Sequence, residues 1–387
     1  MGGYTKAQIN DLYERIVKDI DISNELFDDA ETEYMSLGRW IDKETPTYKI
    51  GVYPQGSFAL GTVIKPLTGT DDYDLDLVCE FAEQYGLTAE ELKCSVVKPL
   101  LQRYRKTRGD IEEKRRCWHV EYEEVPKFHM DVVPAVFCNG YIKITDHNED
   151  NDTYEYIGSN PKGYIDWFRG RMDRRRKIIR EQYCKDHKDI ITCQADIEKL
   201  KEYHYKTPLQ KAIQLLKRHR DIMFQNDENN RKPISIIITT IAAELYNNED
   251  NIFDTLCSFL LGAEKYITSH MNHGEYYIKN PSYTGGTIEN FADKWNEHAE
   301  RAESFKNWIQ QAKSDLIDEQ LFNFTRLKMA ENIKKSMGEI TQKRVFSTMA
   351  EEERKSIGEQ HTKVNPVTGS LSLTGSIPVS KNHHFGK

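Results

Sequence analysis

No apolar run in this 387-residue chain approaches the length of a membrane-spanning helix. The first residues, Met1-Gly2-Gly3-Tyr4-Thr5-Lys6, contain no apolar core of a secretory signal. The seven cysteines are an odd number at irregular spacing, which disfavours a disulfide framework. We therefore expect a cytoplasmic protein with reduced thiols and no association with a membrane.

The chain also lacks an excess of basic residues. It has 54 Lys and Arg against 62 Asp and Glu, a formal net charge of −8. Because clustered basic charge drives non-specific binding to phosphate backbones, long nucleic acid is not an expected partner. One basic run, between Arg169 and Arg180, is either a solvated helix face or an electropositive rim that draws nucleotides towards an acidic site. Cys184, His187, Cys193 and His204 match no common zinc spacing, so we expect a solvated helical insertion there.

Residues 56 to 78 contain the most informative pattern. Gly56 and Ser57 open a small-residue loop able to hold a phosphate, and the strand-like segment Asp74-Leu75-Asp76-Leu77-Val78 follows. Successive side chains of a strand point to opposite faces, so Asp74 and Asp76 share one face. Two carboxylates this close repel each other unless a divalent cation lies between them, which favours a Mg²⁺ site. The alternative is a solvated acidic strand edge. Asp72 has the same parity and is a weaker candidate ligand.

A third carboxylate lies in the strand-like segment from Phe128 to Val136. Asp131 is its only acid. By itself it fits a hydrogen-bonded core carboxylate equally well, but beside Asp74 and Asp76 it is the expected third ligand of a two-metal site for phosphoryl displacement. His129 shares its parity and could face the same cleft, although a core histidine is the stronger expectation.

These motifs resemble the polymerase β-type nucleotidyltransferase fold, and within it the bacterial CD-NTases, relatives of cyclic GMP-AMP synthase and oligoadenylate synthase. Three further stretches support the narrower resemblance: Gly158 to Tyr164, the helix-like segment Thr207 to Asp221, and Glu289 to Trp295. The resemblance covers about residues 50 to 300. It implies an α+β fold, with a mixed sheet and flanking helices, followed by a helical domain like that of oligoadenylate synthase.

The resemblance also implies an activity and a set of site residues. The enzyme would join ATP or other nucleoside triphosphates into a cyclic di- or trinucleotide with release of pyrophosphate, as a signal in anti-phage (CBASS) defence. Two Mg²⁺ ions, with Mn²⁺ as a substitute, would bind Asp74, Asp76 and Asp131. Gly56 and Ser57 would hold phosphates of the donor nucleotide. Lys217 and Ser235 match the family's triphosphate contacts, the alternatives being a surface lysine and a serine that merely starts a helix.

Hydrophobic spacing outlines the rest of the chain. Ile9, Leu12, Tyr13, Ile16, Val17 and Ile20 predict an amphipathic first helix, strands concentrate in residues 51–137, and helices dominate after about residue 165. Thr207, Pro208 and Gln210 form a helix start with a capping box. We expect a catalytic core over 1–165, a helical domain over 166–350 and a flexible tail over 351–387. The tail is rich in Ser, Thr, Gly, Asn and Pro. It is either inert or binds an operon-encoded regulator or conjugation enzyme.

Three other activities remain open. A nucleotidyltransferase that extends RNA or a small acceptor would keep every catalytic residue and change only the product. A nucleic-acid-activated synthase of linear oligonucleotides would need an extended basic face, for which only the run from Arg169 to Arg180 is available. A catalytically dead sensor or scaffold is the least favoured, because all three carboxylates are present.

Overall fold

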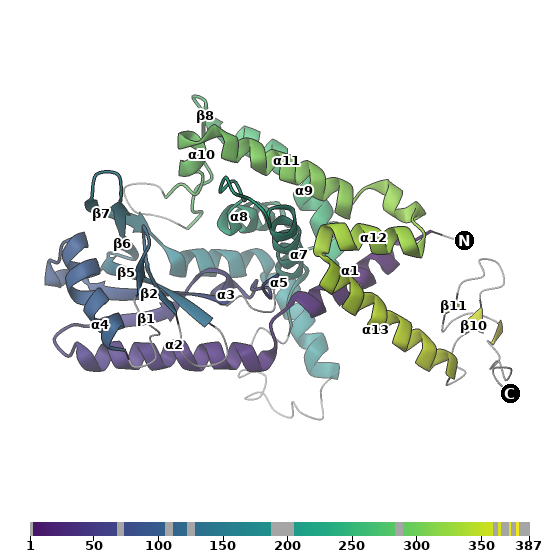
Figure 1. Cartoon of the computed structure of the whole chain (residues 1–387), viewed down its shortest axis with the longest axis horizontal. Helices are drawn as coiled ribbons and strands as arrows, with labels where there is room; N and C mark the ends of the chain where they lie inside the picture. Colours follow the sequence, from purple (N-terminus) through teal and green to yellow (C-terminus); the bar gives the residue numbers. More distant parts are fainter. Residues whose placement is uncertain are drawn as a thin grey trace.

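The computed structural model describes residues 3–67, 73–104, 111–121, 128–186, 205–282 and 289–358, and the pairs 363–364, 371–372 and 377–378. A strand-rich body and a helical body lie side by side along the long axis (Figure 1). The elements up to the end of the sheet are α1 (Lys6–Ile20), α2 (Asn24–Glu44), β1 (Ile50–Pro54), α3 (Gly56–Leu60), β2 (Tyr73–Ala82), a 3₁₀ turn (Glu83–Tyr85), a π-helical segment (Glu91–Val97), α4 (Lys98–Arg103), β3 (Glu112–Glu113), β4 (Trp118–Glu121), β5 (Phe128–Cys138), β6 (Tyr141–Asn148) and β7 (Thr153–Ser159).

Helices dominate the part of the chain that the structure describes after β7. They are α5 (Pro161–Asp186), α7 (Pro208–Met223), α8 (Ser235–Leu245), α9 (Ile252–Ser269), α10 (Asp293–Glu297), α11 (Ala299–Leu316), a 3₁₀ turn (Glu319–Asn323), α12 (Arg326–Met337) and α13 (Glu339–Gly358), with a small hairpin of β8 (Met271–Asn272) and β9 (Glu275–Tyr276). The expected change to helix at about residue 165 is therefore confirmed.

The strand-rich body is built on one mixed sheet. Its strand order is β1-β2-β5-β4-β3, with β6 paired to the second half of β5 and β7 paired to β6. β2 and β5 run parallel, whereas the other described pairs in this sheet are antiparallel. The sheet extends beyond the predicted 51–137, because Asn139 and Gly140, both at positive φ, turn β5 directly into β6. The α+β prediction is confirmed.

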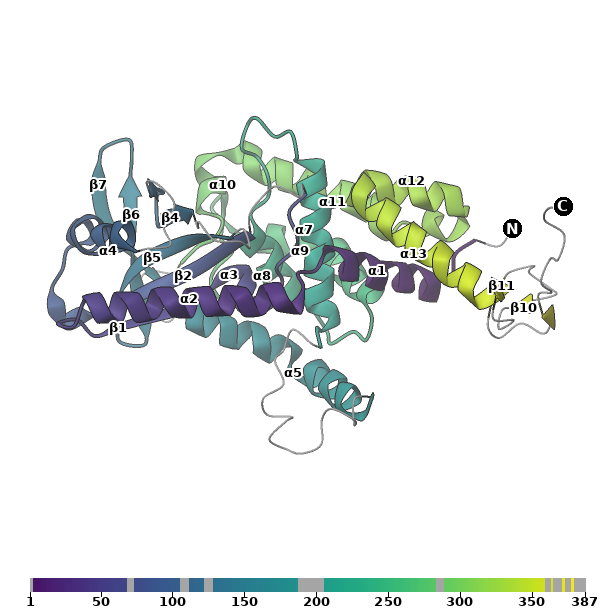
Figure 2. The ribbon, with the colours of Figure 1, turned by 60° about the horizontal axis from the view of Figure 1, so that its bottom comes forward.

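Helices α2 and α4 cover one face of this sheet (Figures 1 and 2). Leu75 and Leu77 of β2 are buried in the same cluster as Leu37 and Ile41 of α2. The predicted alternation along β2 is thus confirmed, and the aspartates between these leucines point to the opposite face.

The first helix packs on the helical body. Each of the six apolar residues predicted to form its stripe is buried, in one cluster with Leu209 and Leu216 of α7. Thr5 and Gln8 form a capping box at the start of α1, as Thr207 and Gln210 do at the start of α7. Only residues 21–23 separate α1 from α2, which packs on the sheet. The proposed divisions at 165 and 350 fall inside α5 and α13, and the domain division stays a prediction.

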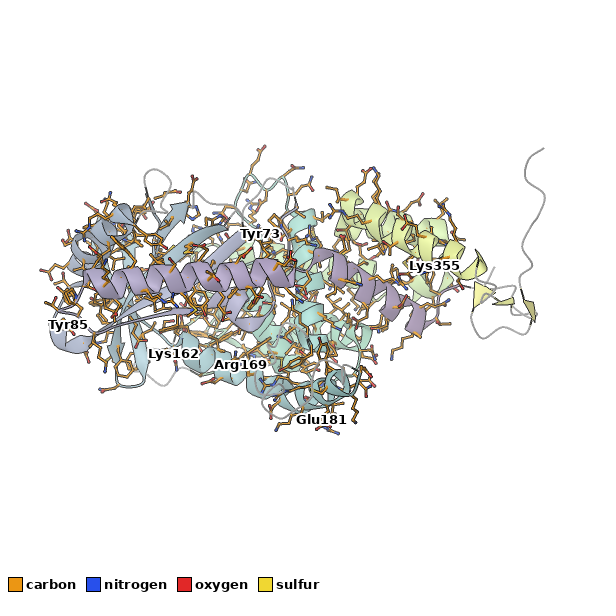
Figure 3. The ribbon with its side chains drawn as sticks, turned by 90° about the horizontal axis from the view of Figure 1, so that it is seen from below. Tyr73, Tyr85, Lys162, Arg169, Glu181 and Lys355 are labelled. Carbon is orange, nitrogen blue, oxygen red and sulfur yellow. The ribbon has the colours of Figure 1, made fainter. Side chains whose placement is uncertain are left out.

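The basic run on α5 holds the end of another helix. Arg171 donates to the carbonyl oxygens of Ala243, Glu244 and Tyr246, and Arg175 donates to that of Asn248. These carbonyls lie at and beyond the C-terminus of α8, where backbone acceptors have no partner within the helix. Arg171 and Arg175 thus serve packing rather than an electropositive rim. Figure 3 shows the course of α5 from Lys162 through Arg169 to Glu181.

The start of the expected tail is helical. α13 continues to Gly358, so residues 351–358 of the expected flexible tail are helical. Lys363–Val364, Leu371–Ser372 and Ile377–Pro378 pair as a small antiparallel sheet. The other tail residues lie outside the described part of the chain, as do Asp72, His187, Cys193 and His204. None of the helices described is long and apolar enough to cross a membrane.

Candidate active site

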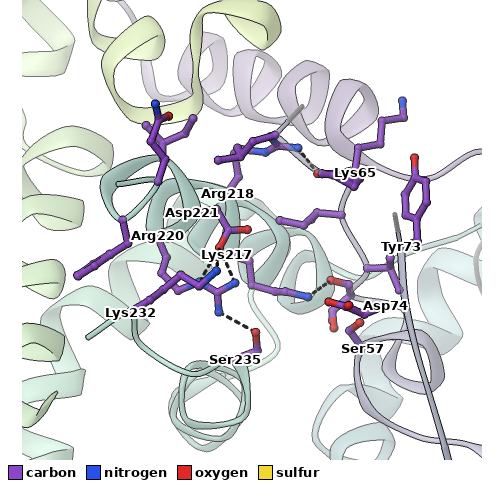
Figure 4. A pocket seen from close by; sticks show the side chains of 18 of the residues that line it. Ser57, Lys65, Tyr73, Asp74, Lys217, Arg218, Arg220, Asp221, Lys232 and Ser235 are labelled. Carbon is purple, nitrogen blue, oxygen red and sulfur yellow. Dashed lines mark hydrogen bonds and ion pairs between the residues drawn. The ribbon is translucent and has the colours of Figure 1, made fainter. Parts of the chain in front are cut away.

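A cavity of about 1150 Å³ lies between helices α7 and α8 and the face of the sheet that is opposite α2 and α4 (Figure 4). Its walls include all of the predicted site residues: Gly56, Ser57, Asp74, Asp76, Asp131, Lys217 and Ser235. They come from five elements, α3, β2, β5, α7 and α8, which the parallel pairing of β2 and β5 and the packing of α7 bring together.

The pairing of β2 with β5 places the three carboxylates next to one another. Asp76 lies opposite Asp131 in the parallel register, and Asp74 lies opposite His129. Burial, and then the neighbouring carboxylates of Asp131 and Asp74, raise the pKa of Asp76 to about 7. Negative charge is therefore concentrated at this face of the sheet.

Two histidines form hydrogen bonds with the carboxylates of Asp131 and Asp74. His119 Nδ1 lies 2.7 Å from Asp131 Oδ1, and His129 Nε2 forms a hydrogen bond with Asp74. The bond to His129 is the main reason why the pKa of Asp74 lies below its usual value. The expectation of a core histidine at 129 is wrong, because its side chain lines the cavity. His119 was not among the predicted site residues. It alternates with the buried Trp118 and Val120, and this alternation already indicated that its side chain lies on the face of the sheet that carries the carboxylates.

The donor set fits a hard divalent cation. Three carboxylates on one face supply oxygen ligands of the kind that Mg²⁺ prefers, and the raised pKa of Asp76 reflects first its burial and then the neighbouring carboxylates of Asp131 and Asp74. Among the described residues, no three His, Cys, Asp or Glu side chains converge as a ready-made ligand group. Asp74 and Asp131 each use their Oδ1 atom for the hydrogen bond with a histidine, and a carboxylate can hold such a bond and ligate a cation at the same time.

The short helix α3 starts directly against Asp76. The backbone N–H of Gln55 donates to the carbonyl of Asp76 at 2.9 Å, which joins the helix start to β2. Gly56 has a φ of 59° and faces the Asp76 carboxylate so closely that no side chain fits. No side chain caps α3, so its first backbone amides are available to an anion.

Lys217 reaches the cavity from the middle of α7. It is 6% exposed, and its Nζ donates to the carbonyl of Thr62 at 2.9 Å. Burial, followed by the nearby charge of Arg220, lowers the pKa of Lys217 to about 8. The alternative of a surface lysine is therefore wrong. The neighbouring Arg218 also lines the cavity, where its guanidinium donates to the carbonyl of Lys65.

Ser235 is the first residue of α8, whose N-terminus has no side-chain cap. Its hydroxyl oxygen accepts a hydrogen bond from Arg220 at 2.7 Å (Figure 4). The start of α8 and the start of α3 both border the cavity. The start of α3 beside Asp76, the start of α8 and the buried Lys217 therefore all provide positive potential at the cavity.

Two of the other family-like stretches meet outside this cavity. Asn160 accepts from the backbone N–H of Gly163 and so caps α5, while Ser159 donates to Glu289 at 2.9 Å. Both stretches contribute to a second cavity of about 530 Å³ between the sheet and α10. Their hydrogen bonds join the strand-rich body to the helical body rather than forming part of the carboxylate site.

The chain is similar to known proteins over most of its length. Residues 8–171 match the family described as the Second Messenger Oligonucleotide or Dinucleotide Synthetase domain. The chain is 29% identical over 326 residues to a c-di-GMP synthase of Roseivirga ehrenbergii, covering 81% of this chain and 80% of that protein. It is 24% identical over 285 residues to the cyclic dinucleotide synthase CdnG of Bradyrhizobium diazoefficiens, covering 69% and 65%.

Solved structures show the same fold. The CD-NTase CdnG of Bradyrhizobium diazoefficiens in complex with GTP superposes with a TM-score of 0.70 at 20% identity, covering 88% of this chain and 99% of that chain. Escherichia coli CdnC with ATP gives a TM-score of 0.59 at 13% identity, covering 85% and 98%. At these identities the likeness establishes the α+β nucleotidyltransferase architecture.

Proposed function

Because the chain belongs to the bacterial CD-NTase family, we propose that it is a cyclic oligonucleotide synthase, which joins nucleoside triphosphates into a cyclic di- or trinucleotide and releases pyrophosphate. The observation that carries this proposal is the register of β2 on β5. It places Asp76 beside Asp131 on the face that Lys217 and Ser235 also border. The names of the relatives make GTP the first substrate to test, with ATP next.

The triphosphate of the donor nucleotide is assigned to the positive side of the cavity. The hydroxyl of Ser57 and the first amides of α3 would bind its terminal phosphates, with Lys217 and Ser235 opposite. Asp74, Asp76 and Asp131 would hold two Mg²⁺ ions, which would supply charge neutralisation for the phosphates and lower the pKa of the attacking ribose hydroxyl. That hydroxyl attacks the α-phosphate, and the bond to pyrophosphate breaks. Catalysis here rests on positioning and charge.

The size of the cavity supports a reaction between two nucleotides. Its volume of about 1150 Å³ exceeds the roughly 300–1,000 Å³ of a pocket for one drug-sized ligand. An acceptor nucleotide would occupy the space beyond the donor. After the first bond forms, the free hydroxyl of the linear intermediate would attack the α-phosphate of its remaining triphosphate. This attack would release a second pyrophosphate and close the ring.

Activation by nucleic acid is less well supported by the surface. The long outer helix α2 is acidic: Glu25, Asp28, Asp29, Glu31, Glu33, Asp42 and Glu44 stand against Arg39 and Lys43. The arginines of α5 that face α8 are already bonded to its carbonyls. Phosphate backbones bind to clustered basic charge, so we favour a synthase that needs no long nucleic acid. A role in CBASS defence, with a regulator or conjugation enzyme acting on the tail, belongs to the same proposal.

Product analysis tests the function directly. The purified protein is incubated with Mg²⁺ and labelled GTP, ATP, CTP and UTP, singly and in pairs, and products are identified by mass spectrometry and nuclease resistance. We expect a cyclic product containing guanosine, which Asp76→Ala abolishes. Linear oligonucleotides alone, or nucleotides transferred to added RNA, would replace the proposal with one of the other nucleotidyltransferase activities.

A further inference from the structure

A buried arginine supports the serine at the start of α8. Arg220 lies in the last turn of α7 and is 6% exposed. Its Nη1 donates to Ser235 Oγ at 2.7 Å and to the carbonyl of Pro233 at 3.1 Å. Its Nε and Nη2 donate to Asp221 Oδ1 at 2.9 and 2.7 Å. The guanidinium is thus fixed on both sides (Figure 4).

The direction of these hydrogen bonds determines what Ser235 can offer. A guanidinium has donors only, so Ser235 Oγ is the acceptor of the bond from Arg220. The single hydroxyl proton of Ser235 therefore remains available for another acceptor. The bond to the Pro233 carbonyl fixes the segment that enters α8, whose first amides have no side-chain cap. The hydroxyl proton and these amides are all donors, which matches an anion.

We propose that Arg220 is a positioning residue for the substrate's triphosphate: it holds the Ser235 hydroxyl and the start of α8 in the orientation that receives a nucleotide phosphate. This inference rests on the proposed function, because the phosphate belongs to a nucleoside triphosphate. Arg220 acts through Ser235 and is not assigned a contact with the reacting atoms. A lysine would keep the charge but has no planar fork with which to join Ser235, Pro233 and Asp221.

The competing explanation is that Arg220 contributes only its positive charge to the cavity. The two explanations predict opposite effects for one substitution. Asp221→Ala removes a negative charge from the cavity wall, which would strengthen phosphate binding if charge alone mattered. If Arg220 must be held in place, the same substitution releases the guanidinium and weakens binding.

The test measures binding of inorganic tripolyphosphate and of GTP by calorimetry, together with kcat and KM. A hydrogen bond to a charged group is worth about 1.5–3 kcal/mol, which corresponds to roughly 10- to 100-fold in affinity. We expect Arg220→Lys and Ser235→Ala each to weaken tripolyphosphate binding and to raise KM to this extent. The double variant should bind within about twofold of Ser235→Ala, because coupled residues are not additive. Arg231→Lys, an exposed arginine of the same connection, should bind like the wild type.

Two results would overturn the inference. One is wild-type binding by Arg220→Lys, and the other is a full additional loss when this change is added to Ser235→Ala. If Arg220→Lys has a lowered melting temperature, the binding of tripolyphosphate by Asp221→Ala decides between the two explanations. Tighter binding by Asp221→Ala would contradict a positioning role of Arg220. The proposed function is tested separately: a protein that makes no cyclic product but loses tripolyphosphate binding in Arg220→Lys refutes the function alone.

Discussion

Gly56 and Asp76 lie so close that a Cβ atom on residue 56 would stand 2.1 Å from Oδ2 of Asp76. Gly56→Ala therefore has to displace the carboxylate, and it also places a side chain at a φ of 59°. Because misplaced catalytic groups commonly cost about 100-fold, we expect kcat for cyclic product to fall by at least that factor. Gly86→Ala is the matched control. It has a φ of 60° and open space around the added atom, so it should lose some thermal stability and keep full activity.

Asp76 should make the metal-free protein sensitive to pH. Its pKa is about 7 in the folded state, against 3.8 for a free aspartate side chain, so folding favours the protonated form. Stability from this residue is present below pH 4 and is lost as the pH rises towards 7. In EDTA, Asp76→Asn should therefore melt higher than the wild type at pH 8, and the gap should close at low pH.

The effect of Mg²⁺ on the melting temperature provides a second test of Asp76. A cation that binds only the folded state raises its melting temperature. We expect Mg²⁺ to stabilise the wild type and to have little effect on Asp76→Asn or Asp131→Asn. Asp74→Asn, Asp76→Asn and Asp131→Asn should all be inactive, while Asp72→Ala should retain much of the activity. An unchanged melting temperature of the wild type in Mg²⁺ would contradict the assignment of these residues as ligands.

The affinity for nucleotides should fall at alkaline pH because Lys217 loses its charge. Its pKa of about 8 means that the free enzyme loses this charge as the pH rises through 8. Since the charged form binds phosphate, kcat/KM for the nucleotide should fall above that pH, while kcat at saturation changes less. Lys217→Ala should raise KM by roughly 10- to 100-fold and remove this decline. The same decline in the variant would assign it to another group. Ser57→Ala should raise KM with a smaller effect.

The basic run on α5 should matter for stability rather than for catalysis. Arg171→Ala removes three hydrogen bonds to carbonyls at and beyond the end of α8, at a cost of about 1.5–3 kcal/mol. We expect a lower midpoint of denaturation and unchanged KM for nucleotides at low temperature. Arg174→Ala, an exposed arginine of the same run, should change neither. A raised KM for nucleotides in Arg171→Ala would instead support the role of this run as an electropositive rim that attracts nucleotides.

Removal of the tail should leave catalysis intact if the cut follows α13. Glu352 and Glu353 form ion pairs with Arg15 and Arg326, so a chain that ends at Gly358 keeps these contacts. We expect it to make the same product at a similar rate from purified nucleotides, and to fail in cells if a partner acts on the tail. Loss of activity in the purified reaction would show that the tail helps to build the site.

The carboxylate cluster could be predicted because strand parity is a local property. Asp74 and Asp76 alternate with buried leucines, so their face followed from the sequence. The hydrogen bond between His119 and Asp131 depends on which strands become neighbours, and that pairing of β4 with β5 is not encoded in either segment alone. The hairpin from β5 to β6 was predictable but missed, since Asn139-Gly140 is a strong turn signal.

The arginines of α5 show the opposite case. A run of basic residues has the same local appearance whether it faces solvent, a ligand or the end of another helix. Its contacts depend on the position of α8, more than sixty residues later in the chain. The burial of Lys217 and Arg220 has the same origin, because the α7 pattern identifies the apolar stripe but not the elements that cover its edges.

The link between α1 and α2 has a mechanical consequence. Lys65, on the cavity wall, donates from its backbone to the carbonyl of Ile20 and from its side chain to that of Asp19. The link at residues 21–23 is therefore tied to the wall of the proposed nucleotide site. A movement of α1 relative to α2 would displace this wall, so we expect a nucleotide bound in the cavity to restrict that movement.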